Sequence, residues 1–453
     1  MEALLPGLVP KIRAALAAGA LLCLTAATGS AAAGPVLIRD AEIEATLRRV
    51  GDPIFRAAGL SPSGVKIYLI QDPEMNAFVA GGQNIFLHTG MIDRMENLDQ
   101  LRGVIAHETG HIAGGHLARR DQAMSGGRNM MLIGMLGAAA AGIAGAPDAS
   151  VAIAAGSQQV ATRNLLAYSR GEEAAADQAG ARYVSTAGGD PAAVLDVLRI
   201  LRGQEALMGR DQDPYTRTHP MSSERIMMLE NRIAKMPKGK APDPEDVYWY
   251  DRMVTKLRAF TEGPAQTIRA NPPVDTSEMA TLARAIAYHR QPDTARAAQQ
   301  MDALLALRPD DPYYIELKGQ FLLEGGKAGP AAAAYRRASE LAPDQPLILA
   351  GLGRALLNTD DPGAAREARD VLSRATRLDR KNSDAYRDLA LAEARLGNEG
   401  AAALATAERY SGSGTPRDVL RNATRAADLL PVGSPGWRRA QDMITMARRA
   451  LKK

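Results

Sequence analysis

Residues 107–111 read His-Glu-Thr-Gly-His, a pattern in which two imidazoles and a carboxylate could act on the same atom. Residues four apart share one face of a helix, so both histidines could bind one metal ion while Glu108 lies beside it. The chain has 6 His and 51 acidic residues in 453 positions. A chance match of this kind is therefore expected only about 0.01 times per chain. The pattern predicts a zinc site of the type that peptidases use.

A catalytic zinc takes three protein ligands and keeps a fourth position for water, so a third ligand must come from elsewhere in the chain. The best candidate is Glu173, in the Ala-rich stretch 168–177, which favours a helix. Asp177 follows one turn later, where it could accept a hydrogen bond from the second nitrogen of a ligand histidine. The sequence therefore predicts one Zn²⁺ per chain, held between two facing helices by His107, His111 and Glu173.

Other candidate ligands fit less well. The pattern H-E-x-x-H-x-x-G-x-x-H would place its last histidine at Leu117, and the sequence has His116 instead. Glu172 would point about 100° away from its neighbour on a helix and would lose the four-residue spacing to Asp177. The remaining histidines are interpreted as packing or surface residues: His88, His116 and His289.

The predicted site supports peptide hydrolysis without a covalent intermediate. Zinc would lower the pKa of a bound water and polarise the scissile carbonyl, while Glu108 would carry the proton from the water to the leaving amine. Residues 76–87 read as a Gly-broken pair of strands ahead of the first zinc helix. An exposed strand there would hold an extended peptide by β-augmentation.

Four blocks of sequence resemble the gluzincin metallopeptidases related to HtpX and the CAAX prenyl proteases, and among them the soluble, periplasmic BepA-like branch. The blocks are Asn76-Ala77-Phe78 with Gly81-Gly82, His107 to His111, Ser169-Arg170 with Glu173 and Ala176-Asp177, and His219-Pro220 with Arg225. They span residues 76–225, about a third of the chain, and their order and spacing make the resemblance specific. The chain lacks several long Leu/Ile/Val/Phe-rich spans, which favours the soluble branch over the membrane-embedded members.

The resemblance implies the same zinc ligands and the same general base, and it adds two residues to the catalytic site. In the BepA-like branch, the histidine of the His-Pro block lies on a loop that covers the zinc and takes its open position. If His219 does so here, the resting enzyme would be latent. Arg225 would lie near the active site, where it would stabilise an oxyanion. Without the resemblance, His-Pro ahead of Ser222 reads equally well as capping of a new helix.

Residues 1–33 have the pattern of a secretory signal peptide. Lys11 and Arg13 are its positive region, residues 14–28 are its apolar core, and cleavage is predicted near Ala33. The chain is therefore expected in the periplasm.

Composition excludes some classes of function. The chain is 46% hydrophobic but only 4% aromatic, with a formal net charge of +4. Charges of both signs are interspersed and aromatic residues are few, so no nucleic-acid surface is predicted. The single cysteine, Cys23, lies in the apolar core of the signal, so the mature chain would contain no disulfide.

The predicted fold has two parts. Residues 34–235 are expected to form an α+β, mostly helical zincin-type metalloprotease domain, and residues 236–272 a linker and bridging helix. Residues 273–453 are expected to form an all-α tetratricopeptide-repeat solenoid of about four repeats with an irregular cap. The basis is a Leu-x-Pro-Asp-x-Pro pattern at 307–312 that recurs 34 residues later at 341–346.

An apolar segment at 130–156 separates the predicted zinc helices. It is rich in Gly and Ala, and its first 17 residues carry no charge, which is marginal for crossing a membrane. The favoured interpretation is a helical hairpin that forms a lid over the active site. Contact with a membrane surface or with an unfolded client is the alternative.

These patterns predict a zinc metalloendopeptidase that degrades misfolded or stalled outer-membrane proteins. The solenoid would bind these clients or their assembly machinery on its concave surface. A chaperone or assembly factor whose protease site is blocked by His219 is the main alternative. An inactive scaffold is disfavoured, because every expected ligand and the base are present.

Overall fold

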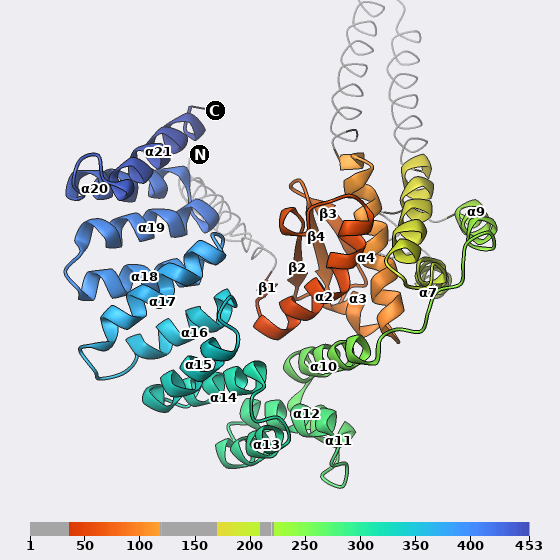
Figure 1. Ribbon diagram of the computed structural model, residues 1–453, viewed down its shortest axis with the longest axis horizontal. Coiled ribbons are helices and arrows are strands. Elements are labelled where there is room, and N and C mark those ends of the chain that lie inside the picture. The colour runs from red at the N-terminus through yellow and green to blue at the C-terminus, as the bar shows by residue number, and fades with distance from the viewer. Residues whose placement is uncertain (1–35, 118, 120–169, 209–218, 220–221, 453) are drawn as a thin grey trace, which may run out of the picture.

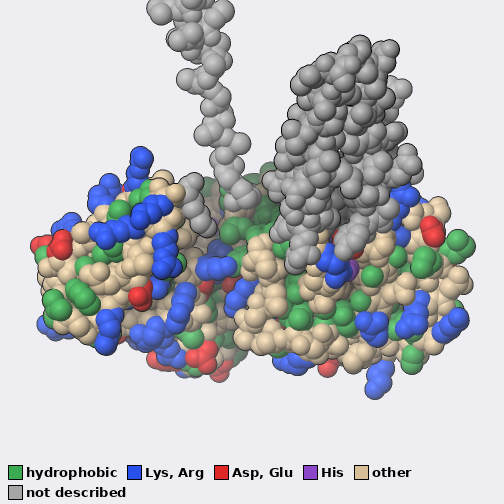
Figure 2. All heavy atoms as spheres, turned by 90° about the horizontal axis from the view of Figure 1, so that it is seen from above, with side chains coloured by type: hydrophobic (Ala, Val, Ile, Leu, Met, Phe, Trp, Pro, Cys, Tyr) green, Lys and Arg blue, Asp and Glu red, His purple; other side chains and the backbone are tan. Residues whose placement is uncertain are grey.

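The computed structural model describes residues 36–117, 119, 170–208, 219 and 222–452. These residues form two lobes, an N-terminal domain around a small sheet and a curved array of helix pairs (Figures 1 and 2). The predicted signal peptide, 1–33, and the apolar segment 130–156 lie outside the described residues. Within the described ranges, no helix combines the length and apolar character needed to cross a lipid bilayer.

A four-stranded sheet lies at the centre of the N-terminal domain. Its strands are β1 (Leu37–Ile38), β2 (Lys66–Ile70), β3 (Ala77–Ala80) and β4 (Asn84–His88), in the order β1-β2-β4-β3. β2 and β4 are parallel, and the other two pairings are antiparallel. β3 and β4 form the predicted hairpin, whose turn contains Gly81 and Gly82 at φ angles of 57° and 97°. Such angles are strained for any residue with a Cβ, so glycine suits both positions. β3 is left as an edge strand.

Helices make up the rest of the described N-terminal domain. They are α2 (Ala41–Ala57), α3 (Thr89–Asp93), α4 (Leu98–Ala113), a helix over residues 170–186, α7 (Ala192–Met208) and α9 (Ser223–Ile233), with a 3₁₀ turn at Pro62–Gly64. α4 begins at Asn97, whose side chain accepts a hydrogen bond from the Gln100 backbone N–H. Its apolar residues pack in the same core as β4, where Ile85 and Leu87 are fully buried.

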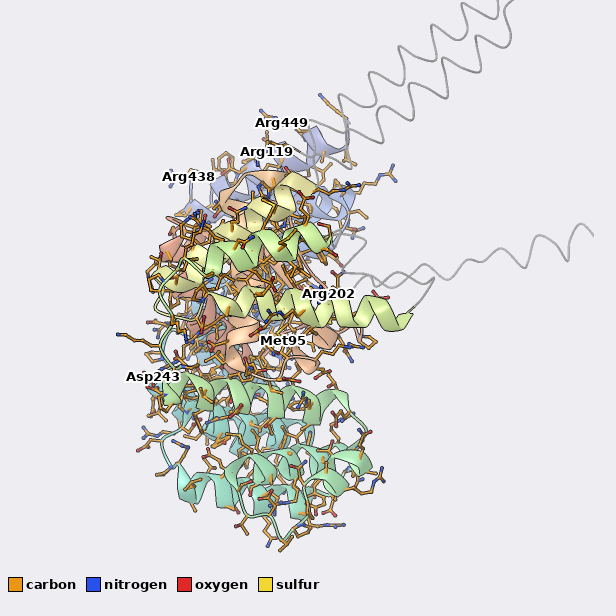
Figure 3. All side chains as sticks on the ribbon, turned by 90° about the vertical axis from the view of Figure 1, so that its right-hand side faces the viewer. Met95, Arg119, Arg202, Asp243, Arg438 and Arg449 are labelled. Carbon is orange, nitrogen blue, oxygen red and sulfur yellow. The ribbon has the colours of Figure 1, made fainter. Side chains whose placement is uncertain are left out.

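Two helices connect the domain to the solenoid. α10 (Pro244–Thr261) begins at Asp243, whose side chain caps the first turn, and a proline follows at the first helical position (Figure 3). α10 packs against α2 of the N-terminal domain and α12 of the solenoid. α11 (Pro264–Ala270) follows it.

The solenoid consists of antiparallel helix pairs. The described helices are α12 (Glu278–Arg290), α13 (Thr294–Leu307), α14 (Pro312–Glu324), α15 (Ala328–Leu341), α16 (Pro346–Leu357), α17 (Ala364–Leu378), α18 (Ser383–Arg395), α19 (Glu399–Ser413), α20 (Pro416–Leu429) and α21 (Pro435–Ala450). The first helices of successive pairs start 33 to 37 residues apart, close to the tetratricopeptide period. A regular pair, α20 and α21, takes the place of the predicted irregular cap. The predicted fold class is confirmed: an α+β, mostly helical domain is followed by an all-α solenoid.

Buried charges join the two lobes. Lys256 of α10 is fully buried, and its Nζ lies 2.7 Å from Asp40 and 3.3 Å from Glu42, at the start of α2. Arg252, also fully buried, is 2.5 Å from both Glu42 and Asp311, the latter at the start of α14. Burial lowers the pKa of Lys256, but the Asp40 and Glu42 carboxylates outweigh that effect and raise it above its usual value. The two cations therefore stay charged and connect α2, α10 and α14.

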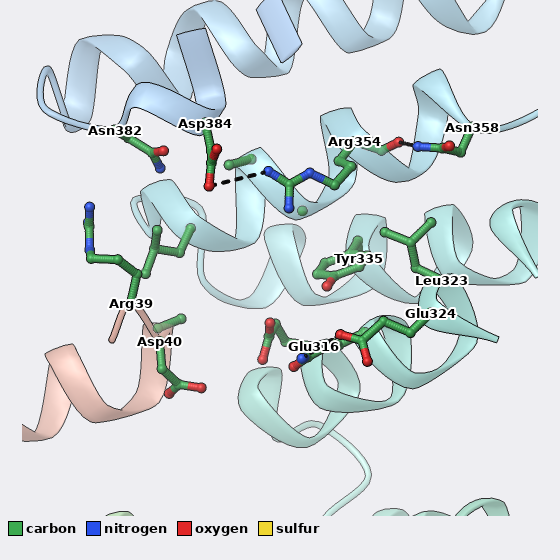
Figure 4. Close-up of a pocket in the computed structure, with 15 residues that line it drawn as sticks. Arg39, Asp40, Glu316, Leu323, Glu324, Tyr335, Arg354, Asn358, Asn382 and Asp384 are labelled. Atoms are coloured by element: carbon green, nitrogen blue, oxygen red, sulfur yellow. Dashed lines mark hydrogen bonds and ion pairs between the residues drawn. The ribbon is translucent and has the colours of Figure 1, made fainter. Parts of the chain in front are cut away.

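The start of α2 enters the inner surface of the solenoid. Ala41 is buried in the same apolar cluster as residues of α14 to α18. Arg39 and Asp40 flank a cavity of about 420 Å³ whose opposite wall includes Glu316 and Arg354 (Figure 4). Arg39 also pairs with Asp379, at 2.6 Å. Part of the predicted client-binding surface is therefore occupied by this chain itself.

We expect Lys256→Ala to lower the free energy of unfolding by about 3–5 kcal/mol, because it leaves buried carboxylates without their cation. Lys318 is the matched control, since its ion pair with Asp302 is partly exposed. Lys318→Ala should cost about 1 kcal/mol or less. Urea unfolding followed by circular dichroism measures both values. Equal losses in the two variants would contradict a special role for the buried cluster.

Candidate metal centre

Two helices meet at the site with almost no space between their backbones. A Cβ at Gly110 of α4 would lie 2.8 Å from the Ala176 carbonyl oxygen, and one at Gly180 would lie 3.1 Å from the Ala106 carbonyl carbon. Real Cβ atoms rarely approach so closely, so glycine at both positions allows α4 and the helix over 170–186 to touch. Because of this contact, side chains that lie one turn apart on α4 face side chains that lie one turn apart on the second helix.

Four donor groups converge at this contact: His107, His111, Glu173 and His219. The His107 and His111 Nε2 atoms are 3.1 Å apart, and each lies 3.4 Å from a Glu173 carboxylate oxygen. His219 Nδ1 is 3.0 Å from Glu173 Oε2 and 3.4 Å from His107 Nε2. All four side chains are buried.

These spacings are close to those around a single metal ion, with His107 and His219 beside one Glu173 oxygen and His111 beside the other. Ligand bonds of about 2.0–2.1 Å at tetrahedral angles separate the donor atoms by about 3.3 Å. The observed separations are 3.0 to 3.4 Å. A set of three imidazoles and one carboxylate is a donor set that zinc accepts. The residues present therefore fit a bound metal ion.

The outer nitrogens of the two α4 histidines are already engaged. His107 Nδ1 lies 2.9 Å from Asp177 Oδ1, the contact predicted from the four-residue spacing in the second helix. His111 Nδ1 lies 2.9 Å from His116 Nδ1. An ionised carboxylate only accepts, so His107 donates from Nδ1 and presents the lone pair of Nε2 to the centre.

The electrostatics of the site keep its carboxylates ionised. Burial raises the pKa of Glu173, but the neighbouring His219, His107 and His111 outweigh it and hold that pKa well below its usual value. Asp177 is also shifted to a lower pKa, because His107 and Arg225 outweigh the effect of burial. The centre thus combines an ionised Glu173 with imidazole donors, which suits a cation, while Asp177 is paired with Arg225.

A small cavity opens beside the donors. It has a volume of about 190 Å³ and is lined by Glu108, His111 and His219 together with Phe78 and Val79 of the edge strand β3. Glu108 is fully buried, and its Oε1 lies 3.7 Å from His219 Nε2. A carboxylate, a metal-binding cluster and an edge strand thus share one cavity.

Comparison with known proteins agrees with this geometry. The sequence model of Peptidase family M48 matches residues 41–233, the part of the chain that holds the sheet, both site helices and α9. These residues form a Peptidase family M48 domain. The resemblance predicted from the four sequence blocks is thereby confirmed. It makes the domain a peptidase and implies a metal cofactor.

Several curated relatives extend beyond the M48 domain. The chain is 26% identical over 404 residues to the beta-barrel assembly-enhancing protease of Escherichia coli (strain K12), covering 88% of this chain and 81% of the relative. The protein of the same name in Yersinia pestis is 23% identical over 91% of this chain and 85% of its own length. The mitochondrial metalloendopeptidase OMA1 of Schizosaccharomyces pombe is 30% identical over 40% of this chain and half of its own.

Solved structures also match part of the chain. MamA is 19% identical and covers 37% of this chain and 94% of its own, with a TM-score of 0.28. A thermophilic TPR protein from Thermus thermophilus is 17% identical and covers 39% of this chain and all of its own, with a TM-score of 0.28.

Arg225 of the M48 domain lies at the site but points at the carboxylates. Its Nε and Nη2 donate to Asp177 at 2.8 and 2.9 Å, and its Nη1 is 3.3 Å from Glu173. The residue lies in the first turn of α9, where the Ser222 hydroxyl accepts a hydrogen bond from its backbone N–H. This geometry differs from the expected oxyanion contact. A guanidinium held by both carboxylates orients Asp177 and, through it, the His107 ring.

His116 of the M48 domain is the residue that sequence reasoning missed. α4 ends at Ala113, and Gly115, with φ of 65°, reverses the chain so that His116 turns back onto His111. A Cβ at Gly114 would lie 2.4 Å from His116 Nε2, so glycine makes room for the ring. The two consecutive glycines that follow His111, Gly114 and Gly115, were the sequence signal from which this chain reversal could have been predicted. Glu172, by contrast, faces Arg119 at 3.6 Å, as its rejection as a ligand predicts.

We expect His116→Ala to weaken binding of added Zn²⁺ by about 10- to 100-fold, because the partner that orients His111 is lost. His289→Ala is the control, since His289 hydrogen bonds to Glu324 in the solenoid. Competition with a chromophoric chelator measures the affinity of each purified variant. Unchanged affinity in His116→Ala would show that the contact has no influence on the centre.

Proposed function

We propose that this protein is a zinc-dependent metalloendopeptidase with Glu173 as its third protein ligand after His107 and His111. The observation that carries the proposal is the close convergence of four buried potential ligand groups directly beside a buried glutamate, Glu108. Three protein ligands plus one further position is the arrangement of catalytic zinc, and the M48 domain supplies the peptidase framework.

A zinc ion in this cluster would supply Lewis acidity, for both water and the scissile carbonyl. The chain's own residues do the remaining work. Glu108 lines the cavity and is placed to take a proton from a water there and to return it to the leaving amine. β3, an edge strand on the same cavity, would hold the substrate backbone in an extended form. Asp177, braced by Arg225, keeps the His107 ring in place.

The proposed substrates are misfolded or stalled outer-membrane proteins in the periplasm. Two observations support this: the relatives that cover most of the chain are named beta-barrel assembly-enhancing proteases, and residues 1–33 have the pattern of a signal peptide. We assign hydrolysis to residues 34–235, the connection to 236–272 and the binding of clients or assembly partners to 273–453. The apolar segment 130–156 stays a candidate lid or membrane-surface contact.

We expect Glu108→Gln to lower the rate of casein cleavage by about 10²- to 10⁴-fold, since the amide cannot carry the proton. Metal content should stay near that of the wild-type protein, because the glutamate is not a proposed ligand. Glu172→Gln, a matched change beside Glu173, should leave both properties intact. Cleavage that persists in Glu108→Gln would overturn the proposed role of this residue.

A second function, as a chaperone or assembly factor with a latent protease site, is favoured by one contact. His219 Nδ1 lies 3.0 Å from Glu173 and 3.4 Å from His107, so it stands at the fourth corner of the cluster. A metal held by all four residues would have no position for water. The resting protein would then bind clients and cut them only after His219 has moved.

We expect His219→Ala to cleave casein faster than the wild type, by about tenfold or more, if removing a blocking ligand frees the fourth position. Metal content should remain near one per chain, because three proposed ligands are left. The measurement compares initial rates of casein cleavage and the metal content of the wild-type and His219→Ala proteins. Slower cleavage with bound metal would mean that His219 assists catalysis and that the site is not latent.

A further inference from the structure

One face of the sheet carries a row of aromatic rings that none of the described helices covers. Tyr68 of β2, Phe86 of β4 and Phe78 of β3 are in register across the three strands. Successive ring centroids are 5.2 Å apart, and both pairs are stacked. The three rings are half-buried, whereas the side chains on the opposite face, such as Ile85 and Leu87, are fully buried in the core. We call Tyr68, Phe86 and Phe78 the aromatic row.

The aromatic row connects two separate cavities. Phe78, at one end, lines the cavity of the metal centre together with Glu108. Tyr68 and Phe86, at the other end, line a cavity of about 420 Å³ between the sheet and the solenoid. Tyr386 of α18 is part of the opposite wall of this interdomain cavity. A continuous apolar floor therefore leads from the solenoid to the metal centre.

The rim of the interdomain cavity is positively charged. Arg380 and Lys381, at the turn before α18, are exposed, and neither forms an ion pair within the described part of the chain. Lys381 Nζ instead lies 5.5 Å from the Tyr68 ring centroid and donates to its hydroxyl at 3.1 Å. Glu408, an acidic residue on the same wall, is neutralised by Arg439 at 2.5 Å. In Figure 2, Lys and Arg side chains gather where the two lobes meet.

We propose that the interdomain cavity and the aromatic row form a capture site for an extended, unfolded polypeptide segment in which aromatic and acidic side chains alternate. Its aromatic side chains would stack on the row and on Tyr386, and its carboxylates would pair with Arg380 and Lys381. This inference rests on the proposed endopeptidase function and adds a substrate preference to it.

The dimensions suit such a segment. Two ring spacings of 5.2 Å make the row about 10 Å long, which about three residues of extended chain span at 3.2–3.4 Å each. A segment bound between the lobes would therefore reach the edge strand and the metal centre within a few residues. A volume of about 420 Å³ lies within the usual range for sites that enclose side-chain-sized ligands.

Binding of labelled peptides to the Glu108→Gln protein tests the capture site without any need for catalysis. One unstructured peptide alternates Phe with Glu, a second replaces Phe by Ala, and a third replaces Glu by Lys. Fluorescence anisotropy should show the first binding at least about tenfold more tightly than the others, given the worth of charge-assisted contacts. Similar affinity for all three peptides would overturn the proposal.

Variants of the cavity locate the binding. The double change Arg380→Glu and Lys381→Glu should weaken the Phe-Glu peptide about tenfold or more and improve the Phe-Lys peptide. Tyr386→Ala should weaken binding of the Phe-Glu peptide and leave binding of the peptide that has Ala in place of Phe unchanged. Arg417→Glu with Arg438→Glu is the matched control, because both residues are exposed on the solenoid and line none of the described cavities named above. Equal effects of the two charge reversals would overturn the assignment to this cavity.

Cleavage kinetics separate this inference from the proposed function. In the His219→Ala background, reversal of Arg380 and Lys381 should raise KM for a long Phe-Glu substrate about tenfold, with kcat unchanged. A short peptide that cannot reach the interdomain cavity should be cleaved as before. If neither substrate is cleaved while the Phe-Glu peptide still binds, the proposed function fails and the capture site stands. An unchanged KM overturns the capture site alone.

Discussion

The close contact of α4 with the helix over residues 170–186 is the constraint on which the site depends. Gly110 and Gly180 remove the Cβ atoms that would separate the backbones. The donor atoms of His107, His111 and Glu173 on the two helices consequently lie 3.1 to 3.4 Å apart in a buried site. Donors of like polarity repel one another there unless a cation is shared. The outer contacts of Asp177 and His116 fix which imidazole nitrogen faces the centre. Both the spacing and the chemical types of these groups suit a metal ion.

The buried cations of α10 form a second constraint, which acts between the lobes. Lys256 pairs with Asp40, directly before α2. Arg252 pairs with Glu42 of α2 and with Asp311 of the solenoid. These bonds hold the solenoid against the start of α2, so part of its inner surface is filled by this chain. One cavity that remains between the lobes lies at the open sheet face, beside the aromatic row. The proposed capture site therefore lies at the junction of the lobes and not in the repeat groove.

The sequence alone predicted those residues of the site that lie four apart on one helix. His107 with His111, and Glu173 with Asp177, are each four residues apart, so a helix alone places each pair on one face. It did not reach His116, because that residue contacts His111 only after the chain reverses at Gly115. It also placed Arg225 near the site but did not predict its contacts with Asp177 and Glu173, since the direction of a guanidinium depends on where α9 packs. The lid predicted for residues 130–156 rests on composition alone and stays a prediction.

The sequence by itself determined the local chemistry: a metal-binding helix, a second helix with paired carboxylates and a run of helix pairs at the tetratricopeptide period. These features depend on periodicity and on the chemical types of neighbouring residues, which a linear chain already contains. Only the tertiary structure decided that His116 lies against His111, that α2 enters the solenoid and that three aromatic rings align toward the metal centre. Such contacts join segments far apart in sequence, and their geometry is set by the packing of whole helices and strands.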